Sequence, residues 1–254
     1  MLNLNGKKGL VVGVANNQSI AYGCAKAFNL CGAELALTYM NAKAEPHVRP
    51  LAEILGATII ESLDVEQPGQ LEALFKVIEE KWGRLDFLLH SIAFAPKDDL
   101  HGRVTDSSRD GFIRAMDISC HSFVRMAKLA EPLMKEGGSL LTMSYMGADE
   151  VIDNYGIMGP VKAALQSVTR YMAAELGEKG IRVTAISPGP LATRAASGIK
   201  EFGKLMDKAK SRAPLHQLVT IEDVGALAAY LVSDAAKSMT GSTIHIDAGY
   251  HIVG

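Results

Sequence analysis

Several features that define whole classes of proteins are missing from this sequence. It has only three cysteines, Cys24, Cys31 and Cys120, and no Cys-x-x-Cys pair. If the segment between Cys24 and Cys31 is helical, about 10 Å of helix axis separates them, which is too far for a disulfide. We therefore expect free thiols in a reducing cytoplasm.

The sequence also lacks an excess of one charge and a long apolar run. Its 26 basic and 28 acidic residues give a net charge of -2, which argues against electrostatic attraction to nucleic acid or to an anionic membrane. No run reaches the roughly 18 to 20 apolar residues that a membrane-spanning helix needs. We expect no nucleic-acid partner and no membrane insertion.

Linkers, internal repeats and metal-ligand motifs are absent too. No Pro- or Ser-rich stretch separates two parts of the chain, so we expect residues 1–254 to form a single domain. The seven histidines show neither His-Glu-x-x-His nor paired ligand spacing, which predicts no metal site. Hydrophobic residues make up 48% of the chain and charged residues 21%, which leaves apolar surface for an oligomer interface.

What is present is an alternation of short apolar, β-rich runs with amphipathic stretches such as Leu71–Trp82 and Val161–Leu176. Strands that are apolar on both faces and joined by helices indicate a parallel sheet covered on both sides. We therefore predict a single-domain, Rossmann-like α/β fold, doubly wound, with about seven strands. The expected strands are Gly9–Val12, Glu34–Tyr39, Thr58–Glu61, Leu85–His90, Ser139–Met143, Ile181–Ser187 and Thr243–Asp247.

Two segments interrupt the alternation, Phe94–Arg109 after the fourth strand and Pro188–Pro214 after the sixth. Both follow the carboxyl ends of strands, where open α/β sheets bind ligands. We predict that the first segment is a polar loop and that both segments wall the substrate site. Gly198 and Gly203 flank an apolar stripe in the second segment, so we expect a mobile lid at about residues 188–214.

A glycine-bearing turn follows the first strand and suits a phosphate. Gly13 lets backbone N–H groups approach a pyrophosphate, and Ser19 and Ile20 open a helix whose N-terminus carries partial positive charge. A complete Gly-x-Gly-x-x-Gly match is absent, so the turn alone fits a tight connection without a ligand equally well. Two further strand ends would lie beside the same nucleotide; they carry Asp64, Val65, Ser91, Ile92 and Ala93.

The chemical end of the site is indicated by Tyr155 and Lys162, seven residues apart. A phenol has a pKa of about 10 and donates a hydrogen bond at neutral pH, and a nearby ammonium favours negative charge on an oxygen that it faces. Pro160 is best tolerated in the first turn of a helix, so the helix that carries Lys162 should begin near Gly159. Tyr145, just after the fifth strand, is a second candidate phenol.

The turn and the Tyr–Lys pair together resemble one family. The segment Gly13-Val-Ala-Asn-Asn-Gln-Ser-Ile-Ala-Tyr-Gly23 looks like the cofactor loop of the enoyl-acyl-carrier-protein reductases almost letter for letter. In the wider short-chain dehydrogenase/reductase superfamily, Tyr and Lys usually lie four residues apart, whereas seven is the spacing of this branch. Met158 stands four residues before Lys162, so the ketone-reducing pattern, which adds a serine such as Ser144, fits less well. The resemblance covers essentially the whole chain.

The resemblance implies a reaction. Members of this family reduce a trans-2-enoyl-acyl-carrier-protein to the acyl-acyl-carrier-protein in fatty acid biosynthesis, by hydride transfer from NADH. By this resemblance Tyr155 stabilises the enolate oxygen, Lys162 holds the nicotinamide ribose, and Tyr145 is the family's second active-site tyrosine. The implied partners are the acyl-carrier protein that carries the substrate and further copies of the chain, in a homotetramer.

The same resemblance implies the binding residues. Those expected to contact the cofactor are Gly13, Ser19, Ile20, Met40, Asp64, Val65, Ser91, Ile92, Ala93, Lys162, Leu191 and Thr193. Those expected to contact the acyl substrate are Ala95, Tyr145, Tyr155, Met158, Ile199, Phe202 and Met206. After the second strand no base occurs before Lys43, which favours NADH over NADPH because the 2′-phosphate of NADPH normally meets Arg or Lys there.

Two alternatives from other classes stay open. One is a short-chain carbonyl reductase or alcohol dehydrogenase, and the other is a non-catalytic dinucleotide-sensing protein. The complete set of Tyr145, Tyr155 and Lys162 argues against the sensor, because a sensor needs no catalytic phenol.

Overall fold

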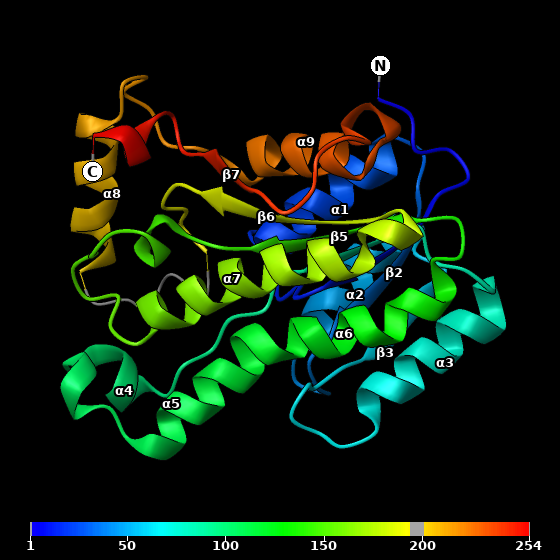
Figure 1. Ribbon diagram of the computed structural model, residues 1–254, viewed down its shortest axis with the longest axis horizontal. Coiled ribbons are helices and arrows are strands. Elements are labelled where there is room, and N and C mark those ends of the chain that lie inside the picture. The colour runs from blue at the N-terminus through cyan, green and yellow to red at the C-terminus, as the bar shows by residue number, and fades with distance from the viewer. Residues whose placement is uncertain (1, 194–200, 254) are drawn as a thin grey trace.

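A parallel sheet of seven strands, covered by helices on both faces, forms the centre of the molecule (Figure 1). The computed structural model describes residues 2–193 and 201–253. The strand order is β3-β2-β1-β4-β5-β6-β7. The chain winds outward in one direction from β1 to β3, then returns to β4 beside β1 and winds the other way. This is the doubly wound arrangement, and the predicted fold class is confirmed.

The seven strands occur where the sequence predicts them, and their ends differ from the prediction by at most two residues. Central strands read as apolar runs because both faces are covered, and all four residues of β4 are buried. The strands are β1 Lys8–Val12, β2 Glu34–Tyr39, β3 Ile59–Ser62, β4 Phe87–His90, β5 Gly138–Met143, β6 Ile181–Pro188 and β7 Thr243–Ile246.

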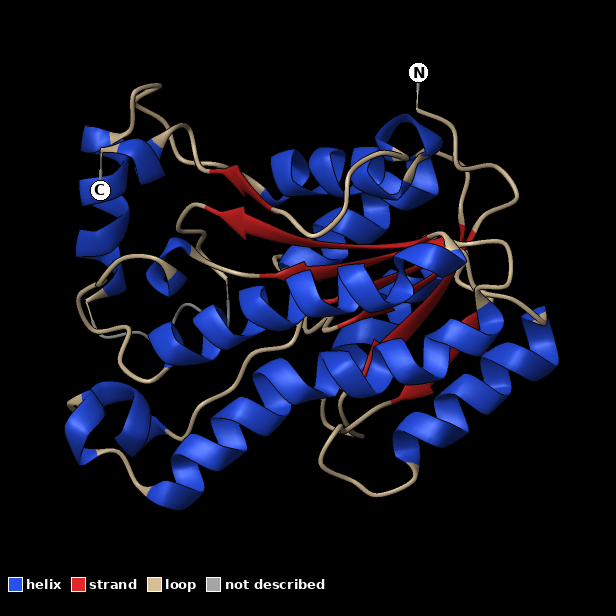
Figure 2. Cartoon of the chain, viewed as in Figure 1, coloured by secondary structure: helices blue, strands red, loops and turns tan. Residues whose placement is uncertain are grey.

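Helices cover the sheet in two groups (Figure 2). The core on one face is closed by α3, α5, α6 and α7, and the core on the other face by α1, α2 and α9. The helices are α1 Ile20–Leu30, α2 Glu45–Ile54, α3 Gln70–Trp82, α4 Lys97–His101, α5 Arg109–Met116, α6 Ser122–Ala130, α7 Met158–Leu176, α8 Phe202–Arg212 and α9 Ile221–Val232. None of those in the described part of the chain is long and apolar enough to cross a membrane.

The helix that carries Lys162 begins at Met158, one residue before the predicted start, with Pro160 in its first turn. All three cysteines are free, as expected.

One local prediction is wrong. The segment Phe94–Arg109 is not simply a polar loop, because it contains α4 and a short 3-10 turn at Val104–Asp106. The carboxylate of Asp99, on α4, accepts hydrogen bonds from the backbone N–H of Ser108 at 2.6 Å and from its hydroxyl at 3.2 Å. This buried carboxylate folds the segment back on itself. A five-residue polar helix has no apolar period by which the sequence could reveal it.

Candidate active site

A cleft runs along the carboxyl ends of the strands, where the sheet topology predicts a ligand site. It consists of two cavities, of about 320 Å³ and 310 Å³. Ala93 and Phe94 line both cavities, so the two adjoin each other after the end of β4. The elongated shape suits a ligand with two ends, such as a dinucleotide with a substrate beside its reactive ring.

The second cavity, here called the cofactor end, lies over β1, β2 and the strands beside them. Seven predicted cofactor residues line it: Gly13, Met40, Asp64, Val65, Ser91, Ile92 and Ala93. The sequence analysis missed several others, among them Thr38, Leu63, Glu66, Arg114 and Ile118. Thr38 and Leu63 adjoin strand ends already chosen, whereas Arg114 comes from α5 and had no local signal.

The turn at Gly13 is shaped to leave backbone exposed to a ligand. Gly13 has φ +108°, and a Cβ built there would lie 2.1 Å from the carbonyl oxygen of Ser91. Only glycine therefore allows β1 to end so close to β4. The hydroxyl of Ser19 accepts hydrogen bonds from the backbone N–H groups of Ala15 and Asn16, both at 3.0 Å. Ser19 thus holds the turn without lining either cavity, while Ile20, at the start of α1, lines the first.

These features fit a dinucleotide. The N-terminus of α1, with its partial positive charge, opens at the tight turn after β1, which is where a pyrophosphate binds in doubly wound folds. Apolar side chains such as Val65, Ile92 and Ile118 line this cavity together with Asp64 and offer a surface for a flat base. The residues present therefore fit the predicted cofactor.

A charged wall closes the cofactor end. The guanidinium of Arg114 donates two hydrogen bonds to the Glu66 carboxylate, at 2.7 and 2.8 Å, and lies 4.6 Å from the centre of the Phe94 ring. The hydrogen bonds from Arg114 lower the pKa of Glu66. Since Phe94 also lines the first cavity, this wall connects the two ends of the cleft.

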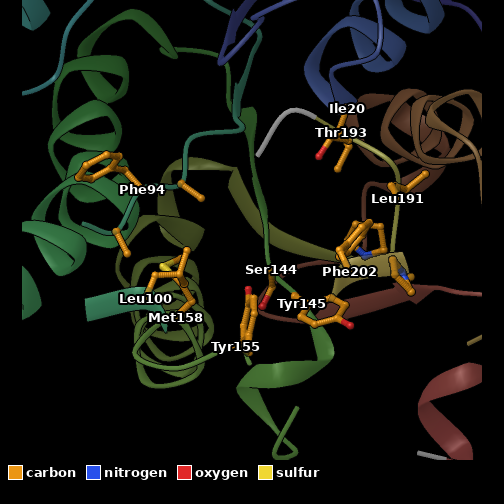
Figure 3. Close-up of a pocket in the computed structure, with 15 residues that line it drawn as sticks. Ile20, Phe94, Leu100, Ser144, Tyr145, Tyr155, Met158, Leu191, Thr193 and Phe202 are labelled. Atoms are coloured by element: carbon orange, nitrogen blue, oxygen red, sulfur yellow. The ribbon is translucent and has the colours of Figure 1, made fainter. Parts of the chain in front are cut away.

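The first cavity, here called the substrate end, is lined mainly by apolar and aromatic side chains (Figure 3). Phe94, Leu100 and Met158 stand on one side, with Leu191 and Phe202 opposite and the two tyrosines between them. The predicted residues that line it are Ile20, Ala93, Ala95, Tyr145, Tyr155, Met158, Leu191, Thr193 and Phe202. Phe94, Leu100, Pro188, Gly189 and Pro190 also line it and belong to the two segments predicted to wall the substrate site, whereas Ser144 was not assigned to the site.

Two predicted substrate residues are not placed in this cavity. Met206 is half-buried on α8, on the same side as Phe202, but it does not line the cavity. Ile199 lies outside the described residues.

The two tyrosines meet edge to face. Their ring centres are 5.0 Å apart at an interplanar angle of 63°. Burial raises the pKa of both phenols, so both are protonated donors at neutral pH. The hydroxyl oxygen of Tyr145 is buried and has no hydrogen-bond partner among the described residues. A bound polar group would satisfy it.

Lys162 is buried and lines neither cavity. Its ammonium is buried and donates a hydrogen bond to the backbone carbonyl of Met143, at the end of β5, at 2.6 Å. Burial lowers the pKa of Lys162 from 10.5 to about 8. The side chain is therefore mostly charged at neutral pH and loses its charge as the pH rises through about 8.

A buried amide fixes the turn that carries Tyr145. The side-chain nitrogen of Gln166, one helical turn after Lys162, donates to the Ser144 hydroxyl at 3.1 Å and to the Asp149 carboxylate at 3.0 Å. Ser144 lines the cleft, yet its hydroxyl already accepts this bond. Nothing in the local sequence around Gln166 indicates this role, because its partners lie on a different segment.

Comparison with known proteins decides the family. Residues 13–251 match the family model described as enoyl-(acyl carrier protein) reductase. The chain belongs to this enoyl-acyl-carrier-protein reductase family. It is 49% identical to enoyl-acyl-carrier-protein reductase (NADH) 1 of Rhizobium meliloti, over 99% of this chain and 92% of that protein. It is 48% identical to the NADH enzyme of Haemophilus influenzae, over 98% of this chain and 95% of that one.

Solved structures agree with this assignment. The reductase of Anaplasma phagocytophilum in complex with NAD is 47% identical, with a TM-score of 0.95 over 99% of this chain and 96% of that one. The Bacillus cereus enzyme, solved with NADP+ and indole naphthyridinone, is 42% identical, with a TM-score of 0.97 over the whole of both chains. The family predicted from the loop and the Tyr–Lys spacing is confirmed.

Proposed function

We propose that this chain reduces the carbon–carbon double bond of a trans-2-enoyl thioester, carried by an acyl-carrier protein, in fatty acid biosynthesis. NADH, the cofactor named for the relatives, supplies the hydride when bound in the cleft. The observation that carries the proposal is a protonated, buried Tyr155 that lines the substrate end, just ahead of the helix whose buried Lys162 is held at the end of β5. The ketone-reducing and sensor alternatives lose support, because the relatives are named enoyl-acyl-carrier-protein reductases and not ketone reductases or sensors.

Tyr155 acts on the substrate. When hydride reaches the β-carbon of the enoyl thioester, negative charge develops on the thioester oxygen. A protonated phenol that lines the cavity can donate a hydrogen bond to that oxygen and lower the barrier. The raised pKa of Tyr155 keeps the phenol neutral and therefore a donor throughout. Tyr145 offers a second hydroxyl, which lacks a partner within the described part of the chain.

Lys162 holds the reacting parts in place. Its ammonium is fixed by the Met143 carbonyl at the end of β5, and it has further N–H donors for the ribose hydroxyls of the cofactor. Its positive charge also favours negative charge on the substrate oxygen. Lys162 therefore serves both ends of the cleft.

The acyl chain would lie against α8. Phe202 lines the cavity, and Leu205 and Met206 are half-buried on the same helix. α8 and the residue that follows it pack through Ala209 and Ala213 on Met146 and Tyr250, beside the turn that carries Tyr145. We propose that α8, within the segment at residues 188–214, closes over cofactor and acyl chain as a lid.

Three further assignments belong to the same proposal. The chain acts as one domain, in the cytoplasm, and as a homotetramer, for which the apolar composition leaves surface. The acyl-carrier protein presents the substrate at the mouth of the substrate end. There Lys204 is paired with Glu201 at 2.6 Å, so α8 presents mixed rather than purely basic charge to the carrier protein.

The test is NADH oxidation by the purified enzyme with a crotonyl thioester and, separately, with simple ketones. The expected result is turnover of the thioester to the saturated product, confirmed by mass spectrometry, with no turnover of ketones. Preferential reduction of ketones would make the chain a carbonyl reductase. Tight NADH binding without turnover of either substrate would make it a sensor.

A further inference from the structure

Three metal-ligating side chains converge at the end of β7, outside the machinery described above. His245 lies on β7, Asp247 follows the strand, and His251 lies in the 3-10 turn Tyr250–Ile252. One ligand atom from each residue can be chosen so that all three atoms lie within 4.8 Å of one another. Two imidazoles and a carboxylate are a donor set that suits a borderline divalent cation such as Zn²⁺.

The distances already approach those of a bound metal. His251 Nδ1 lies 3.0 and 2.9 Å from the two carboxylate oxygens of Asp247. In a zinc site with bonds of about 2.0–2.2 Å, ligand atoms that subtend 90 to 110° are roughly 2.9–3.4 Å apart. The Asp247–His251 separation therefore matches that of two ligands of one ion, and the carboxylate must turn off the hydrogen-bond axis to admit the ion.

The burial of Asp247 and His245 is a second reason to expect a metal ion here. Asp247 is only 7% exposed, and its carboxylate also accepts backbone N–H groups of Gly249 at 3.0 Å and His251 at 2.7 Å. A buried carboxylate held in one orientation is a preorganised ligand. His245 Nδ1 is buried and has no hydrogen-bond partner within the described residues. Buried polar nitrogens are normally satisfied, so this atom marks a place where something can bind.

We propose that His245, Asp247 and His251 form a Zn²⁺ site with an open fourth position for water. Binding of the ion through Nδ1 requires the neutral tautomer of His251 that carries its proton on Nε2, so the proton shared with Asp247 moves from Nδ1 to Nε2 through solvent. The His245 ring now stacks on the His251 ring, with centres 4.0 Å apart and an interplanar angle of 12°. Because imidazole lone pairs lie in the ring plane, His245 must rotate about its side-chain bonds to face the ion.

An ion here would stiffen the floor of the active site. Tyr250, between Asp247 and His251, is buried against Met146, which follows Tyr145, and against Ala209 of α8. Gly189, which lines the cleft, packs on Asp247, since a Cβ at Gly189 would lie 3.1 Å from Asp247 Cα. The proposed site thus joins the turn after β7 to both walls of the substrate end.

The experiment titrates the metal-free, full-length enzyme, without an affinity tag, with Zn²⁺ by calorimetry and with Co²⁺ by visible absorption. The expected result is one equivalent of Zn²⁺ per chain, a Co²⁺ spectrum typical of a low-symmetry site, and a raised melting temperature. His245→Gln and His251→Gln should each weaken binding at least about tenfold. His245→Gln keeps the Asp247–His251 contact, so retained NADH binding would show that it is folded.

The matched control is His121→Gln. His121 forms a similar His–Asp pair with Asp117 at 3.2 Å, also four residues apart, but the described residues supply no third ligand there. This variant should bind Zn²⁺ like the wild type. The proposal is overturned if wild-type enzyme takes up no stoichiometric Zn²⁺, if His245→Gln binds as tightly as wild type, or if His121→Gln loses binding equally.

Discussion

The cofactor end and the substrate end of the cleft differ in the part of the chain that gives them their shape. At the cofactor end the shape comes from backbone: β1 ends at Val12, and the next residue, Gly13, lies so close to Ser91 that no Cβ fits between them. At the substrate end the shape comes from side chains of segments far apart in sequence, such as Leu100, Tyr155 and Phe202. Strand register fixes the first end, whereas packing of loops and of α8 fixes the second.

Substitutions at the two ends should therefore change different properties of the enzyme. Changes at the cofactor end must disturb strands that pair along the centre of the sheet, so they should affect cofactor binding and stability together. Changes at the substrate end remove single side chains from a scaffold that stays intact, so they should affect chemistry or acyl binding alone. Lys162 lines neither end, yet we propose that it holds the cofactor and favours charge on the substrate, so it should be the exception.

The largest effect is expected for Gly13→Ala. The added Cβ would lie 2.1 Å from the Ser91 carbonyl oxygen at φ +108°, and relieving that contact displaces the turn that holds the pyrophosphate. NADH binding, measured by fluorescence titration, should weaken about 10³-fold, with a lower melting temperature. Gly69→Ala is the matched control, because it has φ +82° with nothing within 4 Å of the added Cβ. It should cost about 1 kcal/mol of stability and leave NADH binding unchanged. Equal NADH affinity in the two variants would contradict the backbone account.

Next comes Lys162, which should affect both ends. Lys162→Ala should weaken NADH binding and lower kcat/KM about 10²-fold. In the wild type, NADH affinity and kcat/KM should both decline as the pH rises through about 8, because the Lys162 side chain loses its charge there. Over pH 8 to 10.5 the unfolded chain still binds the proton, so folding stability should rise with pH while activity falls. A flat pH profile between 7 and 9, or normal NADH binding by Lys162→Ala, would remove Lys162 from its assigned role.

Cofactor choice should respond to one side chain at the rim of the cofactor end. Met40 lines the cavity and is 54% exposed, so Met40→Arg can place a guanidinium where a 2′-phosphate would lie. Asn41 is left unchanged in this variant, because its side-chain oxygen accepts hydrogen bonds from the backbone N–H groups of Lys43 and Ala44 and so shapes the turn. The ratio of kcat/KM for NADPH over NADH should rise about tenfold. A wild-type preference for NADPH, abolished by Lys43→Ala, would show that Lys43 reaches the phosphate.

The smallest effect is expected for Phe202→Ala at the substrate end. Loss of a half-buried ring should raise KM for a long-chain enoyl thioester about fivefold, or about 1 kcal/mol, with NADH affinity unchanged. Leu205→Ala, also half-buried on α8 but outside the cavity lining, should change KM less. Equal effects of the two variants would mean that α8 acts as a structural support rather than through direct contact.

Hydrogen exchange of α8 should slow when cofactor and acyl ligand are both bound; unchanged exchange would contradict the proposed lid.

The same comparison explains what the sequence could reveal. The cofactor end could be predicted, because a strand that is apolar on both faces is visible in the sequence as an apolar run. The end of that run marks the carboxyl end of the strand, and Gly13 lies directly after the end of β1. The tyrosines and Lys162 were assigned through the spacing of one family. The Arg114–Glu66 wall and the Gln166–Ser144 bond were not found, since each joins segments that only the fold brings together. α4 was missed because its five residues include a single apolar one, Leu100, and therefore show no periodicity.

The most direct test of the central claim is the rate of a single turnover by Tyr155→Phe with NADH already bound. The variant keeps the ring that packs against Tyr145 at 5.0 Å and removes only the hydroxyl. The account predicts an unchanged NADH dissociation constant and a rate of reduction of crotonyl thioester about 10²-fold lower. A wild-type rate, or a loss of NADH binding that accounts for the slower rate, would contradict the assignment of Tyr155 to the substrate end.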